Sequence, residues 1–257
     1  MLEVRALVAG YADGPDVLKD ITAQLSAGVS VVIGPNGAGK STLLRALLGV
    51  LAPRSGDVLL DGQQLTRLRA RVRARRIAYL PQRPMLSAAF TVEQVVALGR
   101  HAWGPDGPSV RRSLERVGMM DRFSDTFASL SVGQQQRVSL ARALAQLDGA
   151  GSSVLLADEP FSAMDPKHTM QSASILQQLA SDGVTVVVVV HDFTLARRIG
   201  DRALLLDMRG RLAAEGPAAE VLEPARLSEV FGVGFDACDV PGGPALIPVQ
   251  HGVEAGG

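Results

Sequence analysis

A glycine-rich segment, residues 34–42, constrains the fold more than any other part of the sequence. It reads Gly-Pro-Asn-Gly-Ala-Gly-Lys-Ser-Thr and matches the pattern G-x-x-x-x-G-K-[ST]. The apolar, β-branched run before it, residues 29–33, is typical of a buried strand, and residues 42–48 after it predict a helix that Gly49 ends. A strand, a turn and a helix start aim several backbone N–H groups at one point, where an anion is favoured. The segment therefore predicts a phosphate-binding loop.

Every residue of this loop is a candidate nucleotide ligand: Gly34, Pro35, Asn36, Gly37, Ala38, Gly39, Lys40, Ser41 and Thr42. Lys40 would meet the terminal phosphates of a nucleotide, and the hydroxyl of Ser41 would hold Mg²⁺. A glycine-rich turn without a ligand is the alternative. Such a turn would not need the strand before it and the helix start after it, so we expect a nucleotide site here.

Composition and charge give no global signal for nucleic acid. The chain has 257 residues, 47% of them hydrophobic, and its 26 Lys+Arg balance its 26 Asp+Glu. Its single cysteine, Cys238, excludes an internal disulfide and indicates a reducing compartment. The start of the chain lacks a secretory apolar region, and the longest apolar run, residues 184–190, is too short to cross a bilayer. We expect a soluble intracellular protein with one α/β core that carries an insertion.

Two acidic residues follow another apolar run. Residues 154–157 predict a buried strand, and Asp158 and Glu159 come directly after them. At a strand end beside a phosphate loop, Asp158 is suited to hold Mg²⁺, and Glu159 is suited to act as a general base on a water molecule. The alternative is a pair of surface acids that close a strand.

Three further candidates lie at strand ends or turns. Gln82 follows the short strand predicted at residues 77–80 and could reach a metal or a water molecule at the sheet edge. His191 ends the strand predicted at residues 184–190 and could reach a γ-phosphate, although a lone histidine is more often structural. Tyr11, ahead of the loop, could stack on adenine or simply pack in a small sheet.

A second anion-favouring helix start is predicted at Ser131. This residue can N-cap a helix over residues 132–147, whose apolar residues fall on one face. The N-terminus of that helix favours an anion, but an ordinary capped helix explains the pattern equally well. Asp165 is placed to cap the helix that follows it.

Between the nucleotide motifs lie a basic segment and a helical one. Residues 67–76 contain six arginines without interleaved aromatics, which favours a solvated helix or loop over a nucleic-acid site. Residues 91–120 have helical patterning interrupted by glycine and proline at 104–108. We interpret this region as an inserted helical subdomain.

Taken in order, the motifs resemble those of the ATP-binding subunit of ABC transporters: residues 34–41, Gln82, 130–134, 154–159, 162–165 and His191. The resemblance covers almost the whole chain. It implies a P-loop NTPase core, mostly a parallel sheet with flanking helices, with an N-terminal antiparallel β-subdomain and an inserted helical subdomain. It also implies one ATPase domain over residues 1–236, with the helical subdomain at about 85–145, followed by a C-terminal tail, 237–257.

The resemblance implies roles for named residues, with ATP and Mg²⁺ as cofactors. Tyr11 would stack on adenine, Lys40 would bind the β- and γ-phosphates, and Ser41, Gln82 and Asp158 would surround Mg²⁺. Glu159 would be the catalytic base, with His191 and Gln82 at the γ-phosphate and attacking water. The signature residues Ser131, Val132, Gly133 and Gln134, together with Asp165, would face the nucleotide of a second subunit. Catalysis would then require a head-to-tail homodimer closed over two ATP molecules.

Three positions depart from the usual family pattern. Val132 replaces a glycine of the signature, where its backbone N–H is retained but its side chain crowds the approach. Phe161 replaces a threonine and Met164 a leucine. None of these changes removes a proposed catalytic atom.

Further segments resemble bacterial importers of iron chelates, haem and cobalamin: residues 90–100, 216–222, 227–233 and 241–248. The spacer at 146–153 resembles that of the haem-importing branch. This implies integral membrane permease partners, an indirect periplasmic solute-binding protein, no nucleic acid, and a peripheral place on the cytoplasmic face of the inner membrane. The alternatives are an importer of another solute, an exporter, or a soluble ABC-type protein; a single cassette without heptads disfavours the last.

Overall fold

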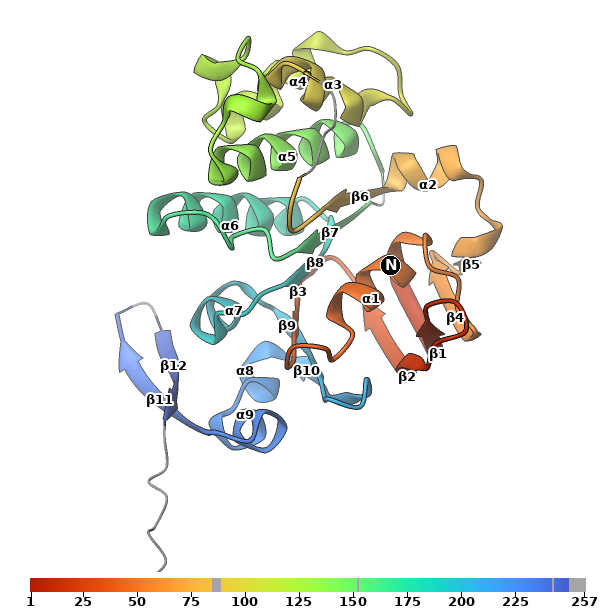
Figure 1. Cartoon of the computed structure of the whole chain (residues 1–257), viewed down its shortest axis with the longest axis vertical. Helices are drawn as coiled ribbons and strands as arrows, with labels where there is room; N and C mark the ends of the chain where they lie inside the picture. Colours follow the sequence, from red (N-terminus) through yellow and green to blue (C-terminus); the bar gives the residue numbers. More distant parts are fainter. Residues whose placement is uncertain (85–88, 152, 242, 250–257) are drawn as a thin grey trace, which may run out of the picture.

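The computed structural model describes residues 1–84, 89–151, 153–241 and 243–249. Two sheets form its framework (Figure 1). The larger is parallel apart from one edge strand and has the order β10 (Leu212–Pro217), β9 (Arg202–Leu206), β3 (Gly28–Ile33), β8 (Thr185–Val189), β7 (Val154–Asp158) and β6 (Ile77–Leu80). The smaller, antiparallel sheet has the order β2 (Asp16–Leu25), β1 (Leu2–Gly10), β4 (Ser55–Leu60) and β5 (Gln63–Gln64). The predicted α/β architecture is confirmed.

The parallel strands are buried on both faces, which explains why they read as continuous apolar runs. Alternate residues of β3 enter different clusters: Val31 and Ile33 face one core, and Val32 faces the other. The second core also contains the inner face of the antiparallel sheet and the helix α1 (Lys40–Leu48). Helix α1 is therefore packed between the two sheets, and this fixes the phosphate loop that precedes it (Figure 1).

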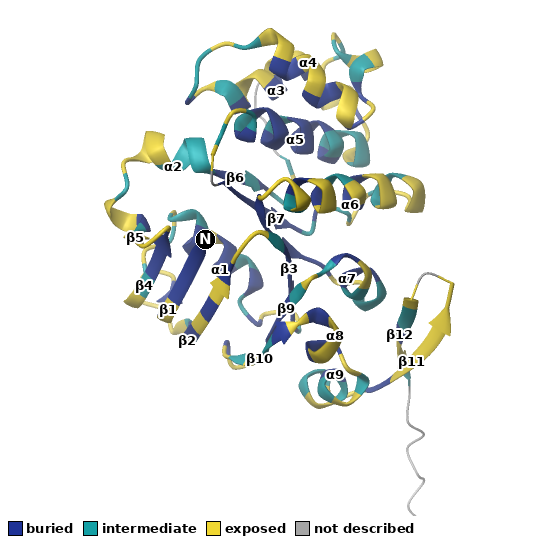
Figure 2. Cartoon of the chain, turned by 180° about the vertical axis from the view of Figure 1, so that it is seen from behind, coloured by how far each residue is buried: buried dark blue, intermediate teal, exposed yellow. Residues whose placement is uncertain are grey.

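Most of the other helices cover the opposite face of the parallel sheet: α5 (Val132–Leu147), α6 (Pro166–Ser181), α7 (Phe193–Ile199), α8 (Ala218–Val221) and α9 (Pro224–Phe231). Their buried faces meet the sheet, whereas the outer face of α6 is exposed (Figure 2). Helices α3 (Val92–Ala97) and α4 (Gly107–Arg116) pack on α5 and share its core. Short 3₁₀ turns occupy Leu65–Arg67, Leu98–Arg100, Met120–Arg122 and Phe127–Ser129. Residue 85, where the helical subdomain is predicted to begin, lies outside the described residues.

The basic segment forms helix α2 (Ala70–Arg76), but it is not simply solvated. The Nε atoms of Arg71 and Arg75 donate to the carbonyl of Ala102, at 3.2 and 2.9 Å. The guanidinium of Arg75 also stacks on Trp103, 4.7 Å from the ring centroid. Arg71 and Arg75 thus join α2 to the helical region, whereas Arg67 and Arg69 are exposed.

The predicted C-terminal tail contains structure that its weak pattern did not indicate. Strands β11 (Gly234–Val240) and β12 (Gly243–Val249) form an antiparallel hairpin, and the predicted boundary between residues 236 and 237 falls inside β11. Aromatic edge contacts of Phe193 with Phe231 and Phe235 attach the hairpin to α7 and α9. Residues 152, 242 and 250–257 of the predicted spacer and tail lie outside the described residues. Within the described ranges, every helix is too short or too polar to span a bilayer.

Truncation of Leu44 tests the packing of α1 between the sheets. Leu44 is fully buried, so Leu44→Ala should lower the free energy of unfolding by about 2–5 kcal/mol through lost burial and a cavity. Leu98→Ala, at a side chain that is 42% exposed, is the matched control and should change it by less than about 0.5 kcal/mol. Urea denaturation followed by circular dichroism measures both; equal losses would contradict this packing.

Candidate functional site

Most of the polar side chains predicted to form the nucleotide site lie at one edge of the parallel sheet. Strands β3, β8, β7 and β6 are neighbours. The phosphate loop, His191 and Gln82 follow the carboxyl ends of β3, β8 and β6, and the acidic pair lies at the end of β7, with Asp158 as its last residue. The register places Asp158 beside Val189, and Val189 beside Val32. Carboxyl ends of neighbouring parallel strands meet at one edge, where ligands of open α/β sheets bind. The site is thus formed by segments that are far apart in the sequence.

The phosphate loop ends in a helix start that has no side-chain cap. Gly39 is the N-cap residue of α1, has φ 94°, and no hydrogen bond from its side chain is possible. The left-handed backbone favours glycine at this position, because a residue with a side chain would be strained there. Gly34 and Ala38 are buried, whereas Asn36 and Gly37 are exposed at the tip of the turn. The first N–H groups of α1 are thus available to an anion.

Lys40 is buried at the start of α1. Its Nζ donates to the carbonyl oxygens of Gly34 at 2.7 Å and Pro35 at 2.9 Å. Burial lowers the pKa of Lys40, although the carboxylates of Glu159 and Asp158 raise it. The ammonium is therefore held by backbone carbonyls of the loop, close to where phosphates would be held.

Asp158 fits the requirements of a Mg²⁺ ligand. The residue is 5% exposed, and its Oδ1 is buried without a hydrogen-bond partner among the described residues. Its Oδ2 accepts a long hydrogen bond, 3.5 Å, from the hydroxyl of Tyr79. Burial raises the pKa of Asp158, and nearby Glu159 adds to this, whereas the neighbouring Ser41 hydroxyl and the hydrogen bond from Tyr79 lower it. A buried carboxylate oxygen without a donor is suited to a hard cation, and Ser41 is the neighbouring oxygen ligand.

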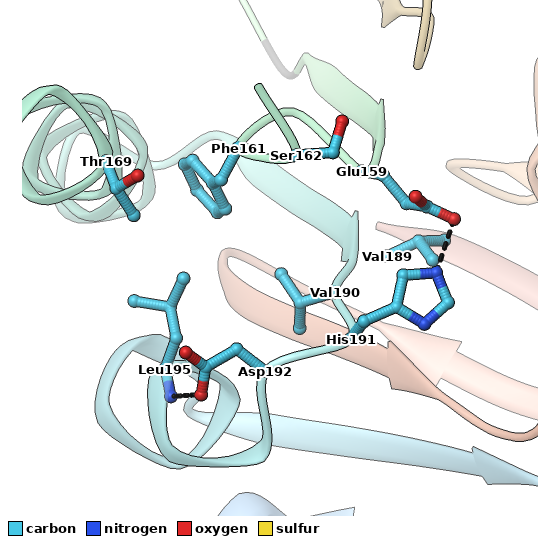
Figure 3. A pocket seen from close by; sticks show the side chains of 9 residues that line it. All are labelled: Glu159, Phe161, Ser162, Thr169, Val189, Val190, His191, Asp192 and Leu195. Carbon is cyan, nitrogen blue, oxygen red and sulfur yellow. Dashed lines mark hydrogen bonds and ion pairs between the residues drawn. The ribbon is translucent and has the colours of Figure 1, made fainter. Parts of the chain in front are cut away.

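Glu159 contacts the other two catalytic candidates, Gln82 and His191. Its Oε2 accepts a hydrogen bond of 2.6 Å from Gln82 Nε2, and its Oε1 lies 2.5 Å from His191 Nε2. Figure 3 shows the carboxylate and the imidazole pointing toward one another, beside a pocket of about 220 Å³. The carboxylate is thus oriented from two sides by groups that follow β6 and β8, the two strands beside β7.

The backbone of Glu159 is also unusual. Its φ of 46° lies in the left-handed region, which is unfavourable for a residue with a side chain and persists where the surrounding structure fixes it. Its N–H donates to the carbonyl of Val189 at 3.2 Å, which continues the pairing of β7 with β8 by one residue. The turn after β7 therefore holds the carboxylate at the sheet edge.

Tyr11 is exposed but not free. Its hydroxyl accepts a hydrogen bond of 2.7 Å from Arg45 Nη1 and lies 3.3 Å from Thr42 Oγ1, both on α1. The guanidinium of Arg45 also lies 5.6 Å from the centroid of the ring. The aromatic ring is thus tethered beside the phosphate loop, where a base attached to bound phosphates could reach it.

The signature residues lie at the start of α5. Ser131 N-caps α5 and forms a capping box with Gln134; Ser131 and Val132 are exposed, the latter by 53%. Among the described residues, no hydrogen bond joins Ser131, Val132, Gly133 or Gln134 to the phosphate loop. Asp165 N-caps α6 through the N–H of His168 at 2.9 Å. One chain therefore does not bring the signature to its own phosphate loop.

Three residues of the site were missed by the sequence reasoning. Arg45 and Tyr79 contact the predicted residues Tyr11 and Asp158, and Gln136 contacts the backbone of Gln82. Tyr79 carries a signal in hindsight, because a polar hydroxyl stands in an otherwise apolar strand next to that of Asp158; burial and Asp158 raise its pKa to about 12. For Arg45 and Gln136, no local pattern identifies the partner.

A parallel sheet, a phosphate loop with a buried lysine, and two acids at the same edge define a P-loop nucleoside triphosphatase. Comparison with known proteins narrows this class. The sequence profile described as ABC transporter matches residues 18–162. A dimeric ATP-binding cassette in a post-hydrolysis state, bound to ADP and Pi, superposes with a TM-score of 0.74 and 28% identity over 85% of this chain and 99% of that one.

Curated relatives extend the match to most of the chain. Hemin import ATP-binding protein HmuV of Pseudomonas entomophila is 46% identical over 224 residues, which cover 85% of this chain and 88% of that protein. The protein of the same name from Bordetella bronchiseptica is 42% identical over 260 residues, covering 96% and 98%. The chain therefore belongs to the ABC transporter family, as an ATP-binding subunit that hydrolyses ATP.

Replacing Asp158 by a neutral residue tests how burial of its charge affects stability. Burial raises the pKa of Asp158 above its ordinary value of 3.8, so the folded protein binds a proton at this carboxyl more tightly than the unfolded chain does. The ionised carboxylate therefore destabilises the fold in the absence of metal. The free energy of unfolding falls as the pH rises from 3.8 through the raised pKa. Asp158→Asn should therefore raise the Tm at pH 7 in EDTA and remove the extra stabilisation that we expect MgATP to give the wild type. Differential scanning fluorimetry measures both quantities.

Asp165→Asn is the control, because the pKa of Asp165 is shifted in the opposite direction. Hydrogen bonds from His168 lower the pKa of the exposed Asp165 carboxyl, so its replacement should leave the metal-free Tm unchanged or lower it. A lower Tm for Asp158→Asn than for the wild type, in the absence of metal, would contradict the dominance of burial at Asp158.

Proposed function

We propose that this chain powers the import of haem, or of a closely related iron chelate, through a separate membrane permease. The observation that carries the proposal is the identity of 42–46% with proteins named hemin import ATP-binding protein, over most of both chains. The phosphate loop, the acidic pair, Gln82 and His191 at one sheet edge support its ATPase part. ATP hydrolysis would take place on the cytoplasmic face of the inner membrane, where the subunit would be held by its permease.

Within the site, each residue has a proposed task. The loop amides and Lys40 would bind the phosphates, and Ser41, Asp158 and Gln82 would surround Mg²⁺, which when bound would neutralise the phosphate charge. Glu159 would accept the proton of the attacking water, and Gln82 and His191, which contact its carboxylate, would orient that water and the γ-phosphate. Tyr11 would stack on adenine.

The exposed signature supports a proposed homodimer. A single loop leaves the γ-phosphate open to water, and the signature residues do not reach it within one chain. The N-terminus of α5, headed by Ser131, would complete the site of a second copy and supply further N–H groups to the phosphates. Hydrolysis would then depend on closure of the dimer, which would link it to movement of the permease.

Replacing the proposed base separates binding from chemistry. Glu159→Gln removes the proton acceptor and leaves the phosphate loop intact, so ATP affinity should stay within about twofold while turnover falls by at least about a hundredfold. Phosphate release and titration with a fluorescent ATP analogue measure the two quantities. Turnover retained at the wild-type rate would exclude Glu159 as the base.

Lys40→Ala is the matched variant for binding. It removes the buried ammonium from the loop, and it should weaken ATP binding itself rather than turnover of bound ATP alone. Unchanged affinity in this variant would contradict the phosphate-loop assignment.

The cargo is tested with the assembled transporter. The chain is co-purified with its permease, reconstituted in vesicles with the cognate solute-binding protein, and assayed for ATP hydrolysis with haem, ferric siderophores and cobalamin in turn. Stimulation by haem above the other solutes is expected. Stimulation by cobalamin alone, or by none of the three, would favour the alternative of an ABC ATPase for another solute or for export.

A further inference from the structure

A fully buried glutamine connects the segments around the catalytic edge. Gln136 lies in the second turn of α5 and has no exposed surface. Its Nε2 donates to the backbone carbonyl of Gln82 and to Ser162 Oγ, both at 3.2 Å, and its Oε1 accepts from the N–H of Ala163 at 3.3 Å. Polar side chains are rarely buried unless all their groups are satisfied, and these three partners satisfy this amide.

The orientation of this amide is determined by its partners. A carbonyl oxygen needs a donor and a backbone N–H needs an acceptor, so the opposite orientation would set Nε2 against the N–H of Ala163 and Oε1 against the carbonyl of Gln82. Only the observed orientation of the amide can hydrogen-bond both to Gln82 and to residues 162–163. Gln136 therefore relates the backbone position of Gln82 to that of residues 162–163.

Both segments belong to the immediate surroundings of Glu159. Gln82 also contacts the Glu159 carboxylate through its own side chain, at 2.6 Å. Ser162 lies three residues after Glu159, and its N–H donates to the carbonyl of Glu159 at 3.3 Å. A shift of either segment would therefore change the position of the carboxylate or of the group that orients it.

The first turn of the same helix packs on the same segment. An added Cβ at Gly133 would lie 2.6 Å from the carbonyl oxygen of Ala163, so the two backbones are in direct contact. Gly133 lies between Ser131, which caps the helix, and Gln136. The end of α5 that carries the signature is thus attached to residues 162–163 by packing as well as by hydrogen bonds.

We propose that Gln136 is a positioning residue for ATP hydrolysis, which sets Gln82 and residues 162–163 relative to Glu159 and links them to the signature end of α5. This inference rests on the roles proposed above for Gln82 and Glu159. Gln136 contacts no reacting atom. It keeps Gln82 and residues 162–163 in place around Glu159. Binding of a second copy at Ser131 would act on these segments through the same helix.

Gln136→Met keeps the length and packing of the side chain and removes its hydrogen bonds. On the full-length chain, kcat for ATP should fall about tenfold because the carboxylate and its orienting group are no longer held in place. KM and the affinity for ATP should stay within about twofold, since the phosphate loop is untouched. A rise in KM at constant kcat would overturn the proposal.

Gln146→Met is the matched control on the same helix. Its Nε2 also donates to two backbone carbonyls, those of Ala74 at 2.8 Å and Ile77 at 2.9 Å, but at the end of α5 remote from the signature. Both variants should lower the Tm, and only Gln136→Met should lower kcat. Equal losses of kcat in the two variants would show a general structural role and overturn the proposal.

Ser162→Ala supplies a second measurement at an exposed residue. Alone it should lower kcat about threefold, and in the Gln136→Met background it should have no further effect, because the two changes break one connection. If the losses of kcat from the two substitutions add, the proposed link between Gln136 and Ser162 is wrong.

Glu159→Gln separates this inference from the proposed function. If it abolishes turnover while Gln136→Met leaves kcat unchanged, only the positioning role fails. If Glu159→Gln retains turnover, the site assignment on which the inference rests fails with it.

Discussion

The parallel pairing of four strands underlies everything else in this molecule. Backbone hydrogen bonds hold β3, β8, β7 and β6 in order and in register, so four polar segments leave the sheet at the same edge. Each strand is apolar on both faces, and burial of those faces against helices fixes the ladder. Because the strands cannot slip without exposing these residues, the distances between Lys40, Asp158 and Glu159 are set by the sheet.

The edge itself contains groups that work against stability. Asp158 is ionisable and buried, Lys40 is an ammonium held by carbonyls, and Glu159 has a left-handed backbone. Each is unfavourable alone. They persist because the two cores on either side of the sheet supply the stability. The same features are useful toward a phosphate and a cation, which would satisfy the buried charges.

Helix α5 extends this site beyond the sheet. At one end it carries the capped signature segment, in its second turn Gln136 contacts the backbone around Glu159, and at its other end Gln146 and Trp103 attach it to helix α2 and the helical region. A rigid helix with contacts at several points moves as one piece. The signature and the catalytic edge of one chain are therefore mechanically connected.

The amino-acid sequence alone determined the element types, the phosphate loop and the acidic pair, because contiguous apolar runs and turn glycines are local signals. It missed the hairpin of β11 and β12, because β11 is largely exposed and β12 contains two prolines. Only the tertiary structure decided that strand order differs from chain order, that Gln82 and His191 both meet Glu159, and that Arg45, Tyr79 and Gln136 belong to the site. Those contacts join residues dozens of positions apart, and side-chain pairing over such separations leaves no mark on the local sequence.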